Sequence, residues 1–350
     1  MNITFLVGNG FDIQQGLDTR YTDFYQSIEA EENQFYREIE KNPDNWSDFE
    51  YALGEYTKRF KEKIDEENEK NVKSTMFQRF FEDYNKVKND LGDYIEKEES
   101  KFEVSSDGNK VKDTLDNFYK ALEVDDRNIF WKLLAYRNDD DIVNVISFNY
   151  SSILDKAFNP LKNRIKLEWN RDNRHTQLGK FIHIHGEADR YLTLGVNDSS
   201  QIANDFFPEN TLYRLVKPIE IKESRDSRDT EAENIIKTSE IIVIFGMSIG
   251  DTDAKWWNDI NEWLSLDKKR LLLICAYEEN IKSKRDASTY IECRRRWQER
   301  FVGFANYGKE ENQEGFNDKV QNQIFISINQ TTFFPGIAIK KEKIAENTLN

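Results

Sequence analysis

The chain contains seven short runs of apolar, largely β-branched residues, and most of these runs are continuous rather than alternating with polar residues. Strands that are apolar on both faces belong to sheets covered on both sides, as in parallel α/β proteins. Helical patterns separate the later runs, and the alternation of strand and helix is typical of doubly wound sheets. The sequence therefore predicts a mostly parallel α/β sheet with helices on both faces. The predicted strands are residues 3–7, 142–148, 181–185, 191–195, 240–246, 270–275 and 324–328, and the predicted helices are 230–239, 252–265 and 286–302.

Residues 22–140 contain no convincing strand pattern, and their apolar residues recur at helical spacing. We interpret this segment as a helical insertion between the first two strands of a sheet domain formed by residues 1–21 and 141–335. An aromatic stripe in the insertion would form a helix–helix core or, alternatively, a surface for a partner or a second copy of the chain. The stripe comprises Phe77, Phe80, Phe81, Tyr84, Leu91, Tyr94 and Ile95.

Three polar segments are expected outside the regular elements. Residues 168–177 are predicted to be a loop, and residues 197–210 a flexible lid or an irregular cover. Residues 336–350 are predicted to form a flexible tail.

The net charge of −15 argues against a general binder of phosphate backbones, which needs a cationic face. Cys275 and Cys293 are too few and too unclustered for a disulfide framework or a thiolate zinc site. The N-terminal apolar run is too short for a signal peptide, and the longest apolar runs are far below a membrane-spanning length. We therefore expect a cytoplasmic protein without membrane or nucleic-acid partners.

The first predicted strand ends in Gly8-Asn9-Gly10, and Asp12 follows closely. Glycine lacks Cβ, so a ligand can approach the backbone, whose N–H groups can bind an anion. A dinucleotide-binding loop has the spacing G-x-G-x-x-G, but here the next glycine is Gly16. The Asp12 carboxylate would repel phosphate and suits a ribose hydroxyl better. A tight turn without a ligand is the alternative.

Asn149 and Tyr150 follow the second predicted strand at its carboxyl end. Ligands of open α/β sheets bind outside the carboxyl ends of the strands, where an asparagine can both donate and accept hydrogen bonds. We therefore predict that Asn149 binds ribose hydroxyls or a water molecule. The alternative is that Asn149 caps a helix that begins at Ser151.

Two of the three histidines, His183 and His185, lie in one predicted strand and would point to the same face. A metal site would need further ligands, and only Glu187 and the more distant His175 are candidates, so we expect no metal. His185, with Gly186 after it for clearance, is the better candidate for a general base at the strand end. His183 would then be a buried, hydrogen-bonded neighbour.

The loop after the strand at 240–246 contains Ser248 and Asp251, and Gly246 precedes it. Gly246 would give a ligand room, and the Ser248 hydroxyl would contact it. Asp251 or Thr252 would also cap the helix that follows.

All four motifs follow apolar strands, so they would meet at the carboxyl edge of one sheet. The sequence therefore predicts a nucleotide-like ligand in a cleft at this edge. The predicted ligand-binding residues are Gly8, Asn9, Gly10, Phe11, Asp12, Thr19, Asn149, Tyr150, Gly246, Ser248 and Asp251.

Four segments, in this order, resemble the signature blocks of the AbiH family of bacterial abortive-infection proteins: FLVGNGFDIQQGLDTRYTDF, VISFNYSSILD, FIHIHGE and IIVIFGMSIGDTD. The family is similar in turn to sirtuin-like domains, which bind NAD on a Rossmann-like sheet. The first loop of those domains is matched by Gly8, Gly10, Phe11, Gly16 and Leu17. The resemblance implies a Rossmann-like, sirtuin-like fold and a function in antiphage defence.

By this resemblance, Asn149 would hold the nicotinamide ribose or a water, and His185 would be the catalytic histidine. Gly246 and Ser248 would contact the far half of the nucleotide. Asp12 stands where sirtuins have a serine, and the sequence lacks their paired-cysteine zinc module and a recognisable acetyl-lysine channel. The resemblance therefore implies cleavage of NAD itself rather than protein deacetylation.

Release of nicotinamide from NAD expels a neutral ring through an oxocarbenium-like transition state and requires no general acid. His185 would act as base, Asn149 would hold the ribose or water, and Asp12 would favour the developing positive charge. We therefore expect an NAD glycohydrolase without a metal cofactor, active in abortive infection in response to an unknown phage trigger. One alternative is a sensor that binds an ADP-ribose-like nucleotide without turnover and acts through the insertion, and another is a toxin directed at nucleic acid.

Overall fold

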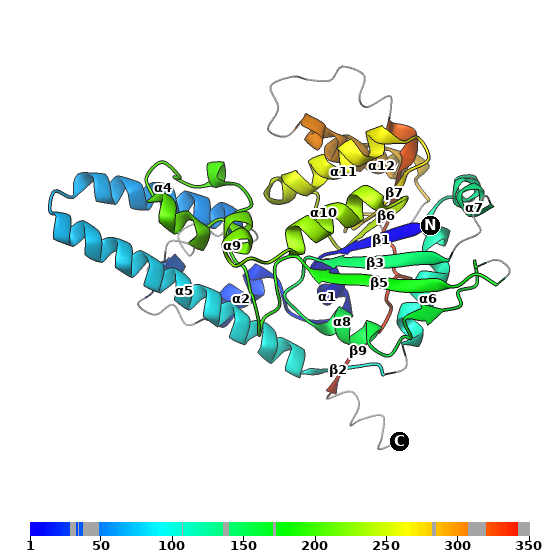
Figure 1. Ribbon diagram of the computed structural model, residues 1–350, viewed down its shortest axis with the longest axis horizontal. Helices are drawn as coiled ribbons and strands as arrows, with labels where there is room; N and C mark the ends of the chain where they lie inside the picture. The colour runs from blue at the N-terminus through cyan, green and yellow to red at the C-terminus, as the bar shows by residue number, and fades with distance from the viewer. Residues whose placement is uncertain are drawn as a thin grey trace.

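A computed structural model describes residues 1–28, 33, 35–37, 49–106, 108–135, 140–170, 173–281, 285–306 and 320–341. Its centre is a seven-stranded sheet with the order β4-β5-β3-β1-β6-β7-β8, in which only the β4–β5 pair is antiparallel (Figure 1). The strands are β1 (Asn2–Val7), β3 (Asp141–Ser147), β4 (Arg164–Ile165), β5 (Thr176–His183), β6 (Ile241–Phe245), β7 (Leu271–Ala276) and β8 (Ile324–Ile328).

The six parallel strands follow the order of a Rossmann fold: the chain adds β3 and β5 on one side of β1, and then β6, β7 and β8 on the other side. The predicted mostly parallel α/β sheet is thus confirmed. The strand order therefore reverses between β1 and β6, and ligands of such sheets bind at this point of reversal. The loops that follow β1, β3 and β6 all meet at this edge.

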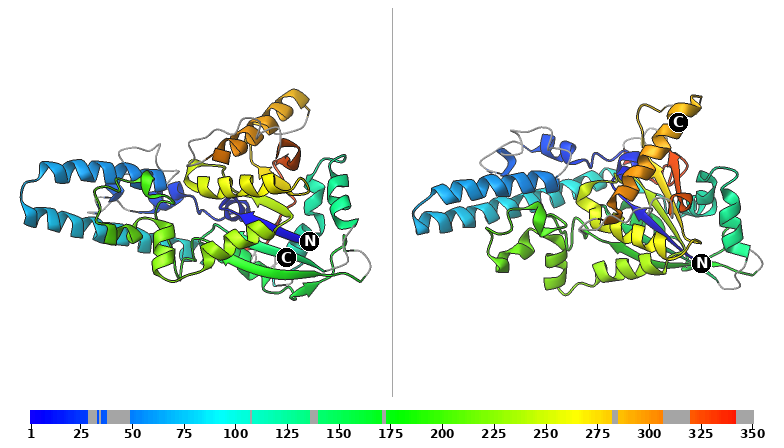
Figure 2. Two further views of the ribbon diagram at one scale, coloured as in Figure 1. Left: turned by 45° about the horizontal axis from the view of Figure 1, so that its top comes forward. Right: turned by 90° about the horizontal axis from the view of Figure 1, so that it is seen from above.

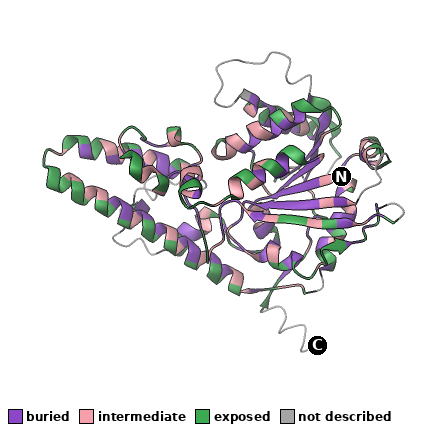
Figure 3. Ribbon diagram, in the orientation of Figure 1, coloured by how far each residue is buried: buried purple, intermediate pink, exposed green. Residues whose placement is uncertain are grey.

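Helices cover both faces of the sheet, and its central strands are buried along their length (Figure 3). One face packs against α10, α11 and α12, and the other against α1, α6, α7 and α8. The helices of the two faces are α1 (Gly10–Gln15), α6 (Asn109–Asn117), α7 (Arg127–Ala135), α8 (Ile153–Phe158), α10 (Arg228–Thr238), α11 (Ala254–Leu266) and α12 (Ala287–Val302), with 3-10 turns η2 (Phe118–Ala121), η5 (Asp251–Asp253), η6 (Gly303–Asn306) and η7 (Gln321–Gln323).

A helical lobe projects from the carboxyl edge of the sheet (Figures 1 and 2). Its core is largely aromatic and includes residues from the segment after β5. The predicted aromatic stripe packs into or against this core, as the helix–helix interpretation expects. The lobe consists of α2 (Tyr21–Ser27), α4 (Phe49–Glu66), α5 (Lys70–Ser100), η3 (Ser199–Gln201), η4 (Glu209–Arg214) and α9 (Lys217–Glu223).

The segment expected as one helical insertion divides between two cores. Its α2, α4 and α5 build the lobe, whereas Leu115, Phe118 and Phe130 from the later part pack against the sheet. The expectation that this segment contains no strand is wrong, because β2 (Phe102–Val104) pairs antiparallel with β9 (Ala338–Lys340). Residues 338–340 therefore do not belong to a free tail, and residues 342–350 lie outside the described residues.

The predicted strand at 191–195 is also wrong. Tyr191 has a φ of 53°, which interrupts an extended strand, and Leu192 and Leu194 are buried in the core of the lobe instead of the sheet. The predicted loop at 168–177 overlaps the start of β5, which begins at Thr176. In the described part of the chain, none of the helices combines the length and the apolar character needed to cross a lipid bilayer.

Candidate functional site

The loops after β1 and β6 contact each other through their backbones. Gly8 N donates to Phe245 O at 2.9 Å, and Gly10 N donates to Gly246 O at 2.7 Å. A Cβ atom on Gly10 would lie 2.6 Å from the Cα of Gly246, and one on Gly8 would lie 2.5 Å from the side chain of Met247. These two glycines are therefore required for the contact between the loops, so the tight turn considered as the alternative accounts for them without a ligand.

Asn9 and Thr19, both predicted to bind the ligand, bond to each other. Asn9 Nδ2 donates to Thr19 O at 2.9 Å, and Thr19 Oγ1 donates to Asn9 Oδ1 at 2.6 Å. The Asn9 side chain is thus engaged in holding the segment after α1 against the first loop. Phe11 is fully buried in the sheet core, so its contribution is packing.

Gly246→Ala is expected to lower the free energy of unfolding by at least about 2 kcal/mol. Gly246 has a φ of 68°, and a Cβ there would lie 2.6 Å from the backbone N of Phe11. The control is Gly303→Ala, because among the described residues no atom beyond its chain neighbours and its own helix lies within 4 Å of the new Cβ. Urea unfolding of the two variants checks this, and equal losses would contradict the loop contact.

Asp12 lies in α1 and is buried, although a carboxylate normally stays in water. Ser151 Oγ donates to its Oδ1 at 2.7 Å. Burial raises the pKa of Asp12 to about 7, with a smaller rise from Glu99, while Ser151 and the nearby Asn149 act in the opposite direction. Asp12 therefore exchanges its proton near neutral pH.

The raised pKa of Asp12 predicts a pH-dependent stability. Between about pH 4 and about pH 7 the folded chain holds a proton at Asp12 that the unfolded chain has lost, so this group's contribution to stability falls as the pH rises through that window. Asp12→Asn keeps an acceptor for Ser151 and removes the titration. Urea unfolding across this window should therefore show the variant gaining stability relative to the parent chain with rising pH, and a constant difference would contradict it.

Asn149 is buried at the carboxyl end of β3. Neither its Nδ2 nor its Oδ1 has a hydrogen-bond partner in the described part of the chain. The amide lies near enough to Asp12 to stabilise its carboxylate, but without the geometry of a hydrogen bond. The alternative role as a helix cap is wrong: the residue before α8 is Ser152, whose N and Oγ both donate to Glu99 at 2.7 Å.

His185 lies in the turn after β5, buried against Phe148 and Tyr150. Its Nε2 is 3.3 Å from the Nζ of Lys217, a lysine that is itself only 1% exposed. Burial, followed by the charge of Lys217, holds the pKa of His185 well below its usual value. The ring is thus neutral, as a general base must be, but its Nε2 faces an ammonium group.

Lys217 is the residue of this site that the sequence does not reveal. Its Nζ donates to Glu50 Oε1 at 2.7 Å, which joins α9 to α4 of the lobe. Burial lowers the pKa of Lys217, but Glu50 and Tyr150 outweigh it, and the net pKa lies above its ordinary value. Burial also raises the pKa of the nearby Asp253 to about 6. In the sequence, the only sign of a buried lysine at this position is that it lies within the apolar stretch LVKPIEI, where a lysine head group has little access to water.

Two predicted contacts lie at the outer side of the site: the side chains of Ser248 and Asp251 are exposed in the loop after β6. A small cavity of about 10 Å³ lies beside His185 and Lys217, with room for about one water. Ile184, Asn197 and Trp256 are among the residues that line it. A dinucleotide does not fit into this volume.

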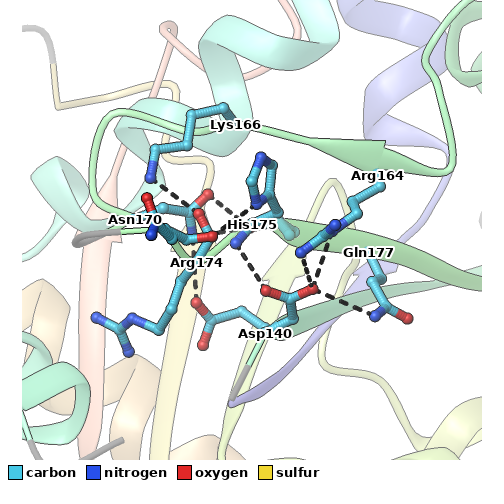
Figure 4. Close-up of polar contacts among 10 residues, drawn as sticks. Asp140, Arg164, Lys166, Asn170, Arg174, His175 and Gln177 are labelled. Atoms are coloured by element: carbon cyan, nitrogen blue, oxygen red, sulfur yellow. Dashed lines mark hydrogen bonds and ion pairs between the residues drawn. The ribbon is translucent and has the colours of Figure 1, made fainter. Parts of the chain in front are cut away.

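The three histidines occupy three separate environments. β5 ends at His183, so the turn that follows directs His185 toward Lys217, whereas His183 lies beside Asn149 O and Phe181. His175 lies before the start of β5, at the opposite edge of the sheet, where its backbone N donates to Asp140 at 2.9 Å (Figure 4). The sequence expectation that His183 and His185 share a face is therefore wrong.

A family model described as bacteriophage abortive infection AbiH matches residues 4–275. The match extends from β1 to β7 and includes the lobe and the loops that follow β1, β3, β5 and β6. None of the curated proteins compared with the chain matches it.

Proposed function

Because this chain belongs to the AbiH family of bacteriophage abortive infection proteins, we propose that it acts on NAD in that role, releasing nicotinamide at the carboxyl ends of β1, β3 and β5. The proposal rests on one observation above all, the unpartnered amide of Asn149. Leaving a buried polar group without a hydrogen bond costs about 1–3 kcal/mol. A ligand with hydroxyl groups, such as a ribose, would satisfy both its donor and its acceptor.

The neighbours of Asn149 supply the remaining chemistry. Asp12 is buried and, when ionised, would stabilise the positive charge that develops on the ribose as the nicotinamide leaves. His185 is neutral and would accept a proton from a ribose hydroxyl or a water. The expelled nicotinamide is neutral, so no group has to protonate it.

The lobe must move for NAD to enter, because the cavity beside His185 holds about one water. Glu50 and Lys217 pair within the lobe, and the contact between Lys217 and His185 Nε2 would have to break in that movement. Opening of the lobe would separate Lys217 from His185 Nε2 and free the lone pair of the imidazole. Conditional activity, released by a trigger during infection, would follow from this arrangement.

A nucleotide sensor without turnover is the second candidate, and the contact between Lys217 and His185 favours it. An imidazole whose lone pair faces an ammonium group is a poor base. The cleft would then bind an ADP-ribose-like ligand through Asn149 and transmit the event through α4 and α9.

Incubation of the purified chain with NAD, followed by chromatography of nicotinamide and ADP-ribose, tests the proposal. Release of both products in equal amounts supports glycohydrolase chemistry. Binding of NAD without release favours the sensor. Neither binding nor release, also with the ion pair removed in the Glu50→Gln/Lys217→Met double variant, would overturn both candidates.

A further inference from the structure

Asp155, His183 and Glu187 form a second cluster of polar side chains, outside the site proposed for NAD. Asp155 comes from α8, His183 is the last residue of β5, and Glu187 lies in the loop after it. One ligand atom from each of the three lies within 4.8 Å of the others, and all three side chains are half-buried. Metal–ligand bonds of about 2.1 Å place ligand atoms about 3–4 Å apart, so these side chains would have to move by at most about an ångström to share an ion.

The hydrogen bonding of His183 leaves one ring nitrogen for a metal. Its Nδ1 lies 3.3 Å from the backbone O of Asn149, and only a protonated Nδ1 can donate to a carbonyl. In the neutral ring, that assigns the lone pair to Nε2. This Nε2 is buried and has no hydrogen-bond partner among the described residues. A buried lone pair without a donor is the situation that a bound cation would resolve.

Both carboxylates keep oxygen atoms that accept no hydrogen bond from the residues that the structure describes. Arg190 donates to Glu187 through Nε at 3.0 Å and Nη2 at 2.7 Å, but both bonds go to Oε1 and leave Oε2. The Arg190 side chain is 63% exposed, and exposed ion pairs of this kind contribute little. Asp155 and Glu187 repel each other at this separation, and a divalent cation between them would remove that repulsion.

We propose that Asp155, His183 and Glu187 bind one divalent first-row cation, Zn²⁺ or Mn²⁺. One imidazole and two carboxylates suit these ions, whereas Ca²⁺ and Mg²⁺ prefer sites made entirely of oxygen ligands. Three protein ligands leave coordination positions for water. The site goes beyond the function proposed above and does not depend on it. The sequence analysis expects no metal, because the sequence alone does not show that Asp155 lies close to His183.

Calorimetric titration of the metal-free full chain with ZnCl₂ and with MnCl₂ tests the site. The parent chain and the control His175→Ala should bind one ion, because His175 lies at the opposite edge of the sheet. Asp155→Asn and Glu187→Gln should each bind at least about tenfold more weakly. Equal affinity in the parent chain and in either variant would overturn the proposal, as would the absence of binding by the parent chain.

Pulsed electron paramagnetic resonance of bound Mn²⁺ gives a readout on the parent chain alone, which decides the question even when a variant fails to fold. Coordination by His183 predicts a nitrogen coupling from one imidazole, which persists in His175→Ala. A spectrum without nitrogen coupling would place the ion elsewhere and overturn the assignment.

Discussion

Asn149→Ala is expected to lower the rate of nicotinamide release from NAD at least about 10²-fold, and His185→Ala about 10²–10⁴-fold. Asn149 has a buried amide without a hydrogen-bond partner among the described residues at the end of β3. His185 is the only neutral buried base among the described residues at this edge. The Asn149 side chain has no hydrogen-bond partner among the described residues, so its loss should fall on turnover rather than on folding. The His185 ring contacts Lys217, Phe148 and Tyr150, and urea unfolding of His185→Ala measures what the loss of these contacts costs.

Initial rates of nicotinamide formation, under conditions in which the parent chain turns over, measure these losses. The matched controls are Asn68→Ala, at an exposed position between α4 and α5, and His175→Ala, at the opposite edge of the sheet. Both controls should keep the parent rate. Parent rates in Asn149→Ala and His185→Ala would show that the chemistry occurs elsewhere.

Lys217→Met is expected to lower the free energy of unfolding by about 3–5 kcal/mol, the usual cost of removing one partner of a buried ion pair. Methionine fills a similar volume, so the loss arises from charge rather than from a cavity. The change removes the cation that lies beside the carboxylates of Glu50 and Asp253. The Glu50 side chain is only 11% exposed. It also removes the group that faces His185 Nε2.

The Glu50→Gln/Lys217→Met double variant separates charge from packing. It should recover most of the lost stability, because no unpaired carboxylate of the pair remains. Lys58→Met is the surface control: its partner is Glu55, the lysine side chain is 59% exposed, and the loss should stay below about 1 kcal/mol. Urea unfolding measures all three, and a loss for Lys217→Met no larger than that of the control would contradict a buried ion pair.

The sheet could be predicted from the sequence wherever a strand is covered on both faces. The run at 324–328 forms β8 with the same bounds, and the runs around β1, β3, β6 and β7 agree within a residue or two at each end. β5 differs because polar residues such as Gln177, which pairs with the two-residue β4, and Lys180 precede Phe181, so its apolar pattern begins late. Residues 191–195 have the composition of a strand, but their apolar side chains pack in the core of the lobe.

The meeting of the loops that follow β1, β3 and β6 at one edge of the sheet could be predicted because parallel strands bring their carboxyl ends together, whatever lies between them in the sequence. The details of the site could not, since they depend on partners that are far apart in the chain. Glu50 and Lys217 come from α4 and α9, and Gly10 meets Gly246 where the paired strands β1 and β6 end. No local pattern encodes such contacts, so the sequence predicts ligand contacts for the glycines and the role of a general base for His185.

Calorimetric titration of the purified chain with ADP-ribose tests the central claim most directly. ADP-ribose is what remains of NAD after nicotinamide leaves, and its binding can be measured without turnover. We expect one equivalent to bind to the parent chain, and Asn149→Ala to bind at least about tenfold more weakly, which corresponds to about 1.4 kcal/mol for the lost hydrogen bonds. Absence of binding by the parent chain, or equal affinity in Asn149→Ala, would contradict a nucleotide site at the carboxyl ends of these strands.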